Sequence, residues 1–456
     1  MRKYLAGAAL AAGAMLCALA RADFSAALKD YNDGHYEQAR AQFLALAELG
    51  DCSSQFNLGA MALKGQGGPK DRGSGVGWLE AAASNGCQQL VGGRLTGLRT
   101  GLSAEDARAA AALMGRYGHD ALAAQGVANP RLDCGTRSAP NVLVSPTPDY
   151  PAEFRGTRPE GIVIMALTVG TDGLARDPEI LLAVPQSAFA PAAVEAWLNS
   201  RFAPASQAGR AVESRLEAKM RFVGPSGKLA DATVFKAALP AAEAGDATAQ
   251  YVVGQAASVD SSLGITSSHA ADLLISAARA GNPQAQYWIA ARMRAATACN
   301  PAGGSTVWLR HAAQGGSASA QVLLAADLLT GSPTPEQVSE ARTLLERASA
   351  ADSYYARKHA GALLAASPVA AVHDPAVALS AANQLRHGDI QTDPQMFDVL
   401  AAVYAVNGTF DGAVEQEEIA IRKATALGWN TRLMRERLAA YRASHPWQGD
   451  LFAPTP

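Results

Sequence analysis

Residues 161–173 read Gly-Ile-Val-Ile-Met-Ala-Leu-Thr-Val-Gly-Thr-Asp-Gly. The apolar run from Ile162 to Val169 is short and rich in β-branched residues, so it predicts a buried strand rather than a helix. Asp172-Gly173 predicts a turn after it, because glycine accepts positive φ and aspartate can bond its own backbone. We therefore expect this stretch to begin a small sheet.

The residues after the turn complete an α/β pattern. A second strand is expected from Glu179 to Leu182, and helical spacing runs from Phe189 to Leu198. From Leu216 to Phe222 apolar and charged residues alternate, which is typical of a strand with one buried face. The segment is therefore predicted to be a curved antiparallel sheet with one helix packed on it.

This segment, roughly residues 140–224, resembles the C-terminal domain of the TonB energy-transducer proteins. The resemblance is carried by features that occur in order: Tyr150-Pro151, Glu160-Gly161 before the apolar strand, Asp172-Gly173, Arg201-Phe202-Ala203-Pro204, Gly209 and the closing alternating strand. It implies partner binding, commonly by adding a strand to an exposed sheet edge. The partner-binding residues are hypothesised to be Tyr150, Pro151, Glu217, Lys219 and Arg221, with Lys219 exposed on the closing strand.

Helical repeats fill most of the remaining chain. Ala249-Gln250, Ala285-Gln286, Ala320-Gln321 and Ala356-Arg357 recur at steps of 36, 35 and 36 residues. A fixed period in this range indicates stacked helical hairpins. The pattern resembles Sel-one-like repeats, which are related to the tetratricopeptide repeat. The expected fold is an α-helical solenoid with an inserted small α+β domain similar to the TonB C-terminal domain.

Two further features of the repeats are predicted from their residues. Small residues at the same place in each unit are expected to let the two helices of a hairpin approach closely. Thr334-Pro335-Glu336-Gln337 combines an N-cap threonine, a proline at the first helical position and a glutamine three residues after the cap. It therefore predicts a helix that starts with a capping box.

Breaks rich in proline or glycine mark the expected domain boundaries. They lie at residues 129–148 and 224–227 and bracket the α/β segment. The predicted segments are a signal peptide (1–22), N-terminal helical repeats (23–130), the TonB C-terminal-like domain (139–224) and C-terminal repeats (229–456).

The first residues predict export. Arg2-Lys3 precede an apolar stretch that runs to Ala20, and Ala20-Arg21-Ala22 fits a signal-cleavage site before Asp23. We therefore expect a cleaved signal peptide and a periplasmic protein. An uncleaved segment that anchors the chain in the inner membrane is the alternative.

Cysteine use fits an oxidising compartment. Once Cys17 is removed with the signal peptide, Cys52, Cys87, Cys134 and Cys299 remain as possible disulfide cysteines. Four cysteines allow three full pairings, and buried free thiols are the alternative. Cys52 and Cys87 are expected in neighbouring repeats, whose helix axes lie about 8–10 Å apart, whereas a bridge needs Cα atoms within about 7 Å. Cys134, in the linker, is expected to reach either of these two cysteines more easily.

Composition and motifs point away from several function classes. Lys plus Arg number 39 against 41 Asp plus Glu, so the net charge of −2 provides no electrostatic footprint for nucleic acid. Neither a Cys-x-x-Cys pair nor a His-Glu-x-x-His helix occurs, and a Gly-x-Ser-x-Gly elbow is also absent. We predict no metal, no cofactor, no small-molecule substrate and no enzymatic activity.

Two classes of function remain in competition. The favoured one is a non-enzymatic periplasmic scaffold that binds envelope proteins through its repeats and its sheet edge. The alternative is a TonB-type energy-transducing transport component that contacts an outer-membrane receptor, which requires the N-terminal apolar segment to be retained. A cell-wall or β-lactam hydrolase is a distant third.

Overall fold

The computed structural model describes residues 23–154, 156, 161–184, 187–223, 231–260 and 263–453. The predicted signal peptide, Glu160 and the predicted linker at 224–227 lie outside these residues. Two compact units are present. Unit 1 comprises residues 1–134, 241–251 and 272–317, and unit 2 comprises residues 135–240, 252–271 and 318–456. The predicted domain limits stay a prediction.

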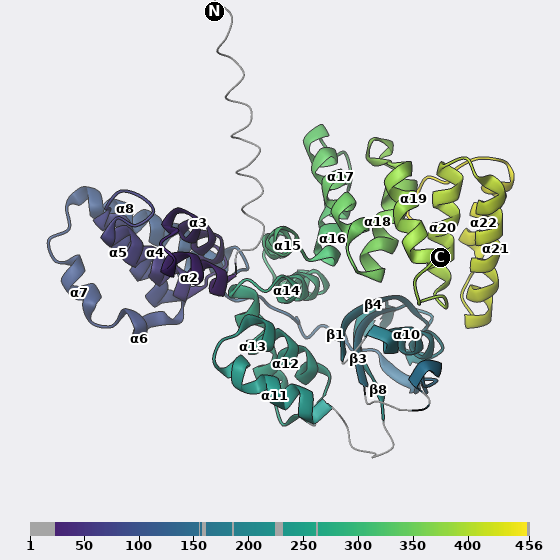
Figure 1. Ribbon diagram of the computed structural model, residues 1–456, viewed down its shortest axis with the longest axis horizontal. Coiled ribbons are helices and arrows are strands. Elements are labelled where there is room, and N and C mark those ends of the chain that lie inside the picture. Colours follow the sequence, from purple (N-terminus) through teal and green to yellow (C-terminus); the bar gives the residue numbers. More distant parts are fainter. Residues whose placement is uncertain are drawn as a thin grey trace, which may run out of the picture. The chain divides into compact units, whose positions relative to one another are not determined.

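Unit 1 is built from helical hairpins (Figure 1). Its helices are α2 (Phe24–Asn32), α3 (Tyr36–Ala47), α4 (Cys52–Lys64), α5 (Arg72–Ala82), α6 (Gln88–Val91), α7 (Arg94–Arg99), α8 (Ala104–Tyr117), α9 (His119–Ala124), α14 (Pro283–Ala295) and α15 (Gly304–Gln314). The unit boundaries fall within α11 (Asp231–Glu243), α12 (Ala247–Val259) and α13 (Ser267–Arg279).

A recurring turn joins neighbouring hairpins. Gly50 and Gly281 take φ values of 79° and 99°, a backbone conformation that glycine adopts without strain. The following residue caps the next helix, since Asp51 accepts a backbone N–H bond of 2.6 Å and Asn282 accepts one of 2.9 Å. The glycine thus ends one helix and the polar residue starts the next.

A glutamine in the first turn of a helix ties that helix to the preceding one at three places. Its Nε2 donates to a carbonyl oxygen eight residues earlier, at the end of the preceding helix: Gln250 to Ala242 (3.2 Å) and Gln286 to Ala278 (3.0 Å) in the repeating Ala-Gln pair, and Gln55 to Ala47 (3.1 Å), where serine precedes the glutamine. Because a buried helix end leaves carbonyls without intrahelical partners, this side chain satisfies one of them at each of the three.

Small residues allow α4 and α5 to pack closely. A Cβ atom at Gly59 would lie 2.8 Å from Leu79 Cγ, and one at Gly75 would lie 2.6 Å from Leu63 Cγ. Neither position has room for a larger residue without displacing its neighbour. The expectation that small residues bring paired helices together is therefore met in this hairpin.

Two disulfides lie in unit 1. Cys52, at the start of α4, bonds to Cys87, which ends the turn after α5, with Cα atoms 5.6 Å apart. Cys134 bonds to Cys299 with a Cα separation of 5.7 Å. The expectation that Cys52 and Cys87 belong to neighbouring repeats was wrong. They lie at the two ends of one helical hairpin, and these ends are close because α4 and α5 are antiparallel neighbours.

Unit 2 contains residues 137–222, which we call the sheet module. Its sheets have the strand orders β4-β3-β8, β2-β5 and β1-β6-β7. The strands are β1 (Arg137–Ser138), β2 (Asn141–Val144), β3 (Gly161–Val169), β4 (Ala175–Val184), β5 (Arg201–Ala203), β6 (Ala205–Gln207), β7 (Arg210–Val212) and β8 (Ser214–Phe222). Strand β3 pairs with β8 without a break, from Gly161 opposite Phe222 to Val169 opposite Ser214. The three strands predicted from sequence are confirmed.

One face of the β4-β3-β8 sheet packs on helix α10 (Ala190–Leu198), as predicted (Figure 1). The rings of Phe189 and Phe222 lie 4.6 Å apart across this face. Gly161 is required beneath them, because a Cβ atom there would lie 2.5 Å from the Phe189 ring. Met220 is also buried, which confirms the assignment of its side of β8 to the core.

The opposite face of the sheet is also covered. Ile162 and Ile164 of β3 form a buried cluster with Phe235 of α11 and Ala256 of α12. Strand β3 is therefore apolar on both sides, which explains why its sequence does not alternate. The sheet lies between its own helix and the helices that follow it in the chain.

The segment predicted as a proline-rich break contributes strands. Residues 137–144 form β1 and β2, which pair with β6 and β5 in antiparallel registers. These strands lie inside the stretch 129–148 that was read as a break, and the domain boundary expected there stays a prediction. Helix α10 ends at Leu198, and the extended residues after it offer backbone groups that β2 satisfies.

The helices after residue 317 continue the repeats within unit 2. They are α16 (Ala318–Leu328), α17 (Pro335–Ala350), α18 (Tyr354–Ala366), α19 (Pro375–Arg386), α20 (Pro394–Val406), α21 (Phe410–Leu427) and α22 (Arg432–Arg442). Helix α17 begins with the predicted capping box, in which Thr334 and Gln337 bond each other's backbone N–H groups. In the part of the chain that is described, no helix has the length and apolar character needed to span a membrane.

We expect Met220→Asp to unfold the sheet module, because its carboxylate would be buried between β8 and α10 without a partner. The loss should be at least about 3 kcal/mol, measured as a lower denaturation midpoint of the full chain by circular dichroism. Val223→Asp is the matched control, since Val223 follows β8 directly and is 45% exposed. An unchanged midpoint for Met220→Asp would show that the face was misassigned.

Replacing Cys52 and Cys87 by serine should destabilise unit 1. The bridge closes a chain segment with a separation of 35 residues, and a loop of that size corresponds to about 4 kcal/mol of denatured-state entropy. Denaturant titration of the double variant against the parent measures the loss. Peptide mapping without reduction should recover Cys52 with Cys87 and Cys134 with Cys299, and any other pairing would contradict the structure.

Candidate functional site

The charged row of β8 faces the protein's own helices. Lys219 Nζ lies 2.7 Å from Asp260 Oδ2, and Arg221 pairs with the same carboxylate, which is only 4% exposed. Glu217 accepts a hydrogen bond of 3.3 Å from Gln255 of α12. Lys219 was expected to be exposed, but its side chain is 25% exposed. The expectation was wrong because α12 and the residues after it cover this face of the sheet.

Tyr150 packs within the module. Its ring lies 5.9 Å from that of Phe189 and 6.0 Å from that of Phe222, both in edge-on geometry. The carbonyl of Pro151 accepts the N–H of Phe154 and starts a short helical turn. The structure thus places both residues at the edge of the α10 core. A role for them in partner binding stays a prediction.

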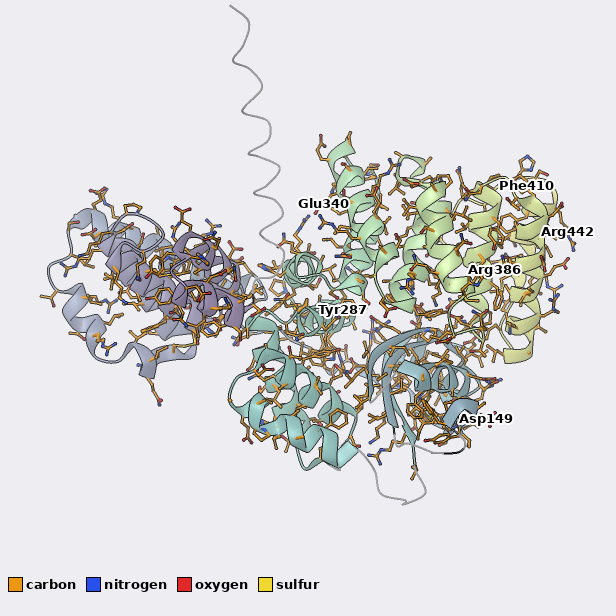
Figure 2. The ribbon with its side chains drawn as sticks, viewed as in Figure 1. Asp149, Tyr287, Glu340, Arg386, Phe410 and Arg442 are labelled. Atoms are coloured by element: carbon orange, nitrogen blue, oxygen red, sulfur yellow. A yellow bond between two sulfur atoms is a disulfide. The ribbon has the colours of Figure 1, made fainter. Side chains whose placement is uncertain are left out.

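The loop before Tyr150 borders a surface cavity of about 280 Å³. Residues of this loop, among them Pro146 and Asp149, line it together with Glu195 and Asn199 of α10. Asp149 is labelled in Figure 2. The cavity adjoins β2, whose Leu143 is 65% exposed. Leu143 is thus an exposed apolar side chain next to this loop in the sequence, which the sequence analysis did not single out.

Strand β4 is held by the C-terminal repeats. Helix α18 packs against it (Figure 1), and Ser319 of α16 donates a 2.5 Å hydrogen bond to Glu179. Arg215 of β8 reaches across β3 and pairs with the same carboxylate. Glu179 is 3% exposed, so its charge is satisfied inside the protein.

A buried charge cluster lies where β4 meets α18. Lys358 is fully buried, and its Nζ lies 2.8 Å from Asp393 Oδ2 and 3.0 Å from Asp177 Oδ1. His359 Nε2 lies 2.8 Å from the same Asp177 oxygen. Gln395 accepts the backbone N–H of Asp177 at 2.9 Å. We call these five residues the Lys358 cluster.

Charge pairing outweighs burial in this cluster. Burial by itself would raise the pKa of Asp177, but His359 and Lys358 hold that pKa far below its usual range. Burial would likewise lower the pKa of Lys358, whereas Asp393 and Asp177 raise it above its ordinary value. Asp177 and Lys358 therefore stay charged near neutral pH, and their ion pair fixes β4 on the repeats.

One feature of the sequence signals this cluster, although its residues were not among the predicted sites. Two residues after the repeating alanine, the other repeats have Tyr251, Tyr287 and Val322, all buried. Lys358 occupies the same position in its repeat. A lysine at a position that the period assigns to the core requires a buried counter-charge. The period alone could not identify Asp177, which lies in the sheet module.

Strands β4 and β8 are the two edge strands of the β4-β3-β8 sheet, and the outer edge of β8 is a candidate binding feature. Strand β8 pairs with β3 on one side, and within the described ranges no strand is paired to its other side. An edge strand exposes a row of backbone N–H and C=O groups that can accept a further strand. Groups of three or more acidic, histidine or cysteine side chains able to hold a metal were not found among the described residues.

The Lys358 cluster should make the stability of the folded protein decrease at acidic pH. The pKa of Asp177 is depressed in the folded state, so its contribution is complete above the unfolded-state pKa of about 4 and is lost progressively as the pH falls below that value toward the folded-state pKa. We expect the melting temperature of the parent to fall more steeply between about pH 5 and about pH 3 than that of Asp177→Asn. Parallel slopes for the two proteins would contradict this assignment.

Comparison with known families agrees with this architecture. Residues 146–224 match the model described as the Gram-negative bacterial TonB protein C-terminal domain. Residues 52–87 and 318–353 each match the Sel1 repeat; these ranges correspond to α4 with α5 and to α16 with α17. A comparison with curated proteins gave no match. The chain thus combines a TonB C-terminal domain with Sel1 repeats, as the sequence motifs indicated.

Proposed function

We propose that the protein is a non-enzymatic scaffold of the bacterial cell envelope whose β8 edge binds a strand of a partner protein. Both families found in the chain are interaction modules, and the TonB C-terminal domain belongs to the Gram-negative envelope. The observation that carries the proposal is the place of β8 at the end of the strand order β4-β3-β8, where no further strand is paired to it within the described residues, in a sheet whose two faces are already covered.

Because both faces of the sheet are covered, few of its side chains are available to bind a partner protein. Lys219 and Arg221 already share Asp260, and recruiting them for a partner would leave a nearly buried carboxylate without its counter-charges. Backbone groups on the strand edge carry no such cost. We therefore propose that main-chain hydrogen bonds along β8 provide the contact, with side chains beyond Phe222 adding specificity.

We propose a periplasmic location. Disulfides persist in oxidising compartments, and the pairs Cys52–Cys87 and Cys134–Cys299 suit one. The predicted signal peptide supports the same compartment. The repeats have a double role in this proposal, since α16 and α18 hold the sheet module while their remaining surface is open to envelope partners.

Photo-crosslinking from Val223 tests the proposal. Val223 directly follows β8 and is 45% exposed, so a photoreactive residue there lies beside the strand edge without disturbing the Asp260 ion pairs. We expect irradiation of cells to yield a discrete adduct with an envelope protein, identified by mass spectrometry. Adding a strand should also protect the amides of β8 from hydrogen exchange when the purified partner is present.

Leu90 is the matched control position, because it is also an exposed apolar residue, at 50%, but lies in α6. The same adduct from both positions, or none from Val223, would refute strand-edge binding. N-terminal sequencing of the mature protein separates the scaffold from the transport alternative. A start at Asp23 fits the scaffold, whereas a retained first segment together with an outer-membrane adduct would favour energy transduction.

A further inference from the structure

Two acidic side chains are buried together in the last helices of unit 2. Asp398 lies in α20 and Glu417 in α21, two helices that pack against each other (Figure 1), and the residues are 1% and 0% exposed. Their carboxyl groups are in hydrogen-bonding contact. Because acidic side chains are almost never fully buried unless they are paired, two ionised carboxylates would require two counter-charges beside them.

Arg437 of α22 is the cation placed against both acids, and it is 2% exposed. Its Nη2 lies 2.6 Å from Asp398 Oδ2, which is a close ion pair. Its Nε lies 3.6 Å from Glu417 Oε1, beyond hydrogen-bond distance. Two carboxylates and this one guanidinium would leave a net negative charge in the core, which is a costly arrangement.

Two further titratable groups act on the pair, and neither adds positive charge. Asp393, the N-cap residue of α20, is itself acidic and is paired with Lys358 at 2.8 Å. Tyr441 of α22 is buried, and burial together with the two nearby acids raises its pKa, so the phenol stays neutral. A proton bound to one of the two carboxyl groups would balance the charge.

The hydrogen bonds lead to the same conclusion. Asp398 Oδ1 and both carboxyl oxygens of Glu417 have no hydrogen-bond donor in the part of the chain that is described. Buried acceptors without donors cost free energy, and two carboxylates in contact repel each other. A proton on Glu417 would supply a donor to Asp398. Burial also raises the pKa of Glu417 well above its usual range, and the Asp398 charge raises it further.

We propose that Asp398 and Glu417 form a proton-binding site, in which the folded protein holds one proton between the two carboxyl groups and loosens α20, α21 and α22 when this proton is released. Glu417 carries the proton, and Arg437 keeps Asp398 ionised. In the unfolded chain both carboxyl groups have pKa values of about 4. The folded state therefore binds one proton more above that pH, so stability falls as the pH rises toward the folded-state pKa.

This pH dependence is opposite in sign to that of the Lys358 cluster, which loses stability in acid. The two sites are connected through α20, which has Asp393 and Gln395 at its start and Asp398 one turn later. Loosening of α20 at alkaline pH would weaken the hold of the Lys358 cluster on β4. The proton site therefore couples the surrounding pH to the attachment of the sheet module, without involving the β8 edge.

Hydrogen exchange of the full chain, measured by mass spectrometry from about pH 6 to about pH 8, tests the site. Protection factors correct for the faster intrinsic exchange at high pH and report how often the helices open. We expect the protection of the α21 and α22 amides to fall by up to about tenfold per pH unit, the effect of one linked proton. Glu417→Gln mimics the protonated acid, so its protection should be nearly independent of pH and should exceed that of the parent at about pH 8.

Glu418→Gln is the matched control, because the Glu418 side chain is 41% exposed and pairs with Arg442, which is labelled in Figure 2. Its protection should follow the pH dependence of the parent. Infrared spectra at neutral pH provide a direct readout, since the parent should show the C=O stretch of a protonated carboxyl group and Glu417→Gln should lack it. An unchanged pH dependence in Glu417→Gln, its loss in Glu418→Gln, or absence of that band from the parent would overturn the proposal.

Discussion

Burial of β3 on both faces is the constraint on which unit 2 depends. An apolar strand of nine residues must be covered twice, and among the described residues of the sheet module α10 is the one α-helix, which covers one face. The second face is covered by α11 and α12, which belong to the repeat region of the sequence. The inserted domain and the repeats that follow it therefore share a hydrophobic core. A fragment limited to residues 139–224 would expose Ile162 and Ile164 to water.

Shared burial also determines how the module can act. A sheet that is free on one face can bind through charged side chains, and Glu217, Lys219 and Arg221 looked suited to that role. Here those side chains are paired with Asp260 and Gln255. A partner protein must then bind to parts of the module that are not used in contacts within the protein. The backbone edge of β8 is one such feature.

The Lys358 cluster adds specificity to the contact between module and repeats. Hydrophobic burial alone would tolerate several orientations of β4 on α18. A buried lysine between Asp177 and Asp393 tolerates few, since a displaced sheet would leave charges unpaired at low dielectric. The cluster thus fixes the register of two parts that are distant in sequence, as buried polar groups do in other packed assemblies.

Local patterns in the sequence were sufficient to predict the strands, helix α10, the repeats and the capping box at Thr334. These features depend on the spacing of apolar residues and on turn chemistry, which act over a few residues. Only the tertiary structure decided which surfaces remain available. A charged residue in an alternating strand gives the same pattern whether it faces water or Asp260, because its partner lies some forty residues away. The pairing of Cys52 with Cys87 and the grouping of Asp398 with Glu417 and Arg437 likewise depend on contacts between residues that are distant in sequence, and a local sequence pattern does not predict such contacts.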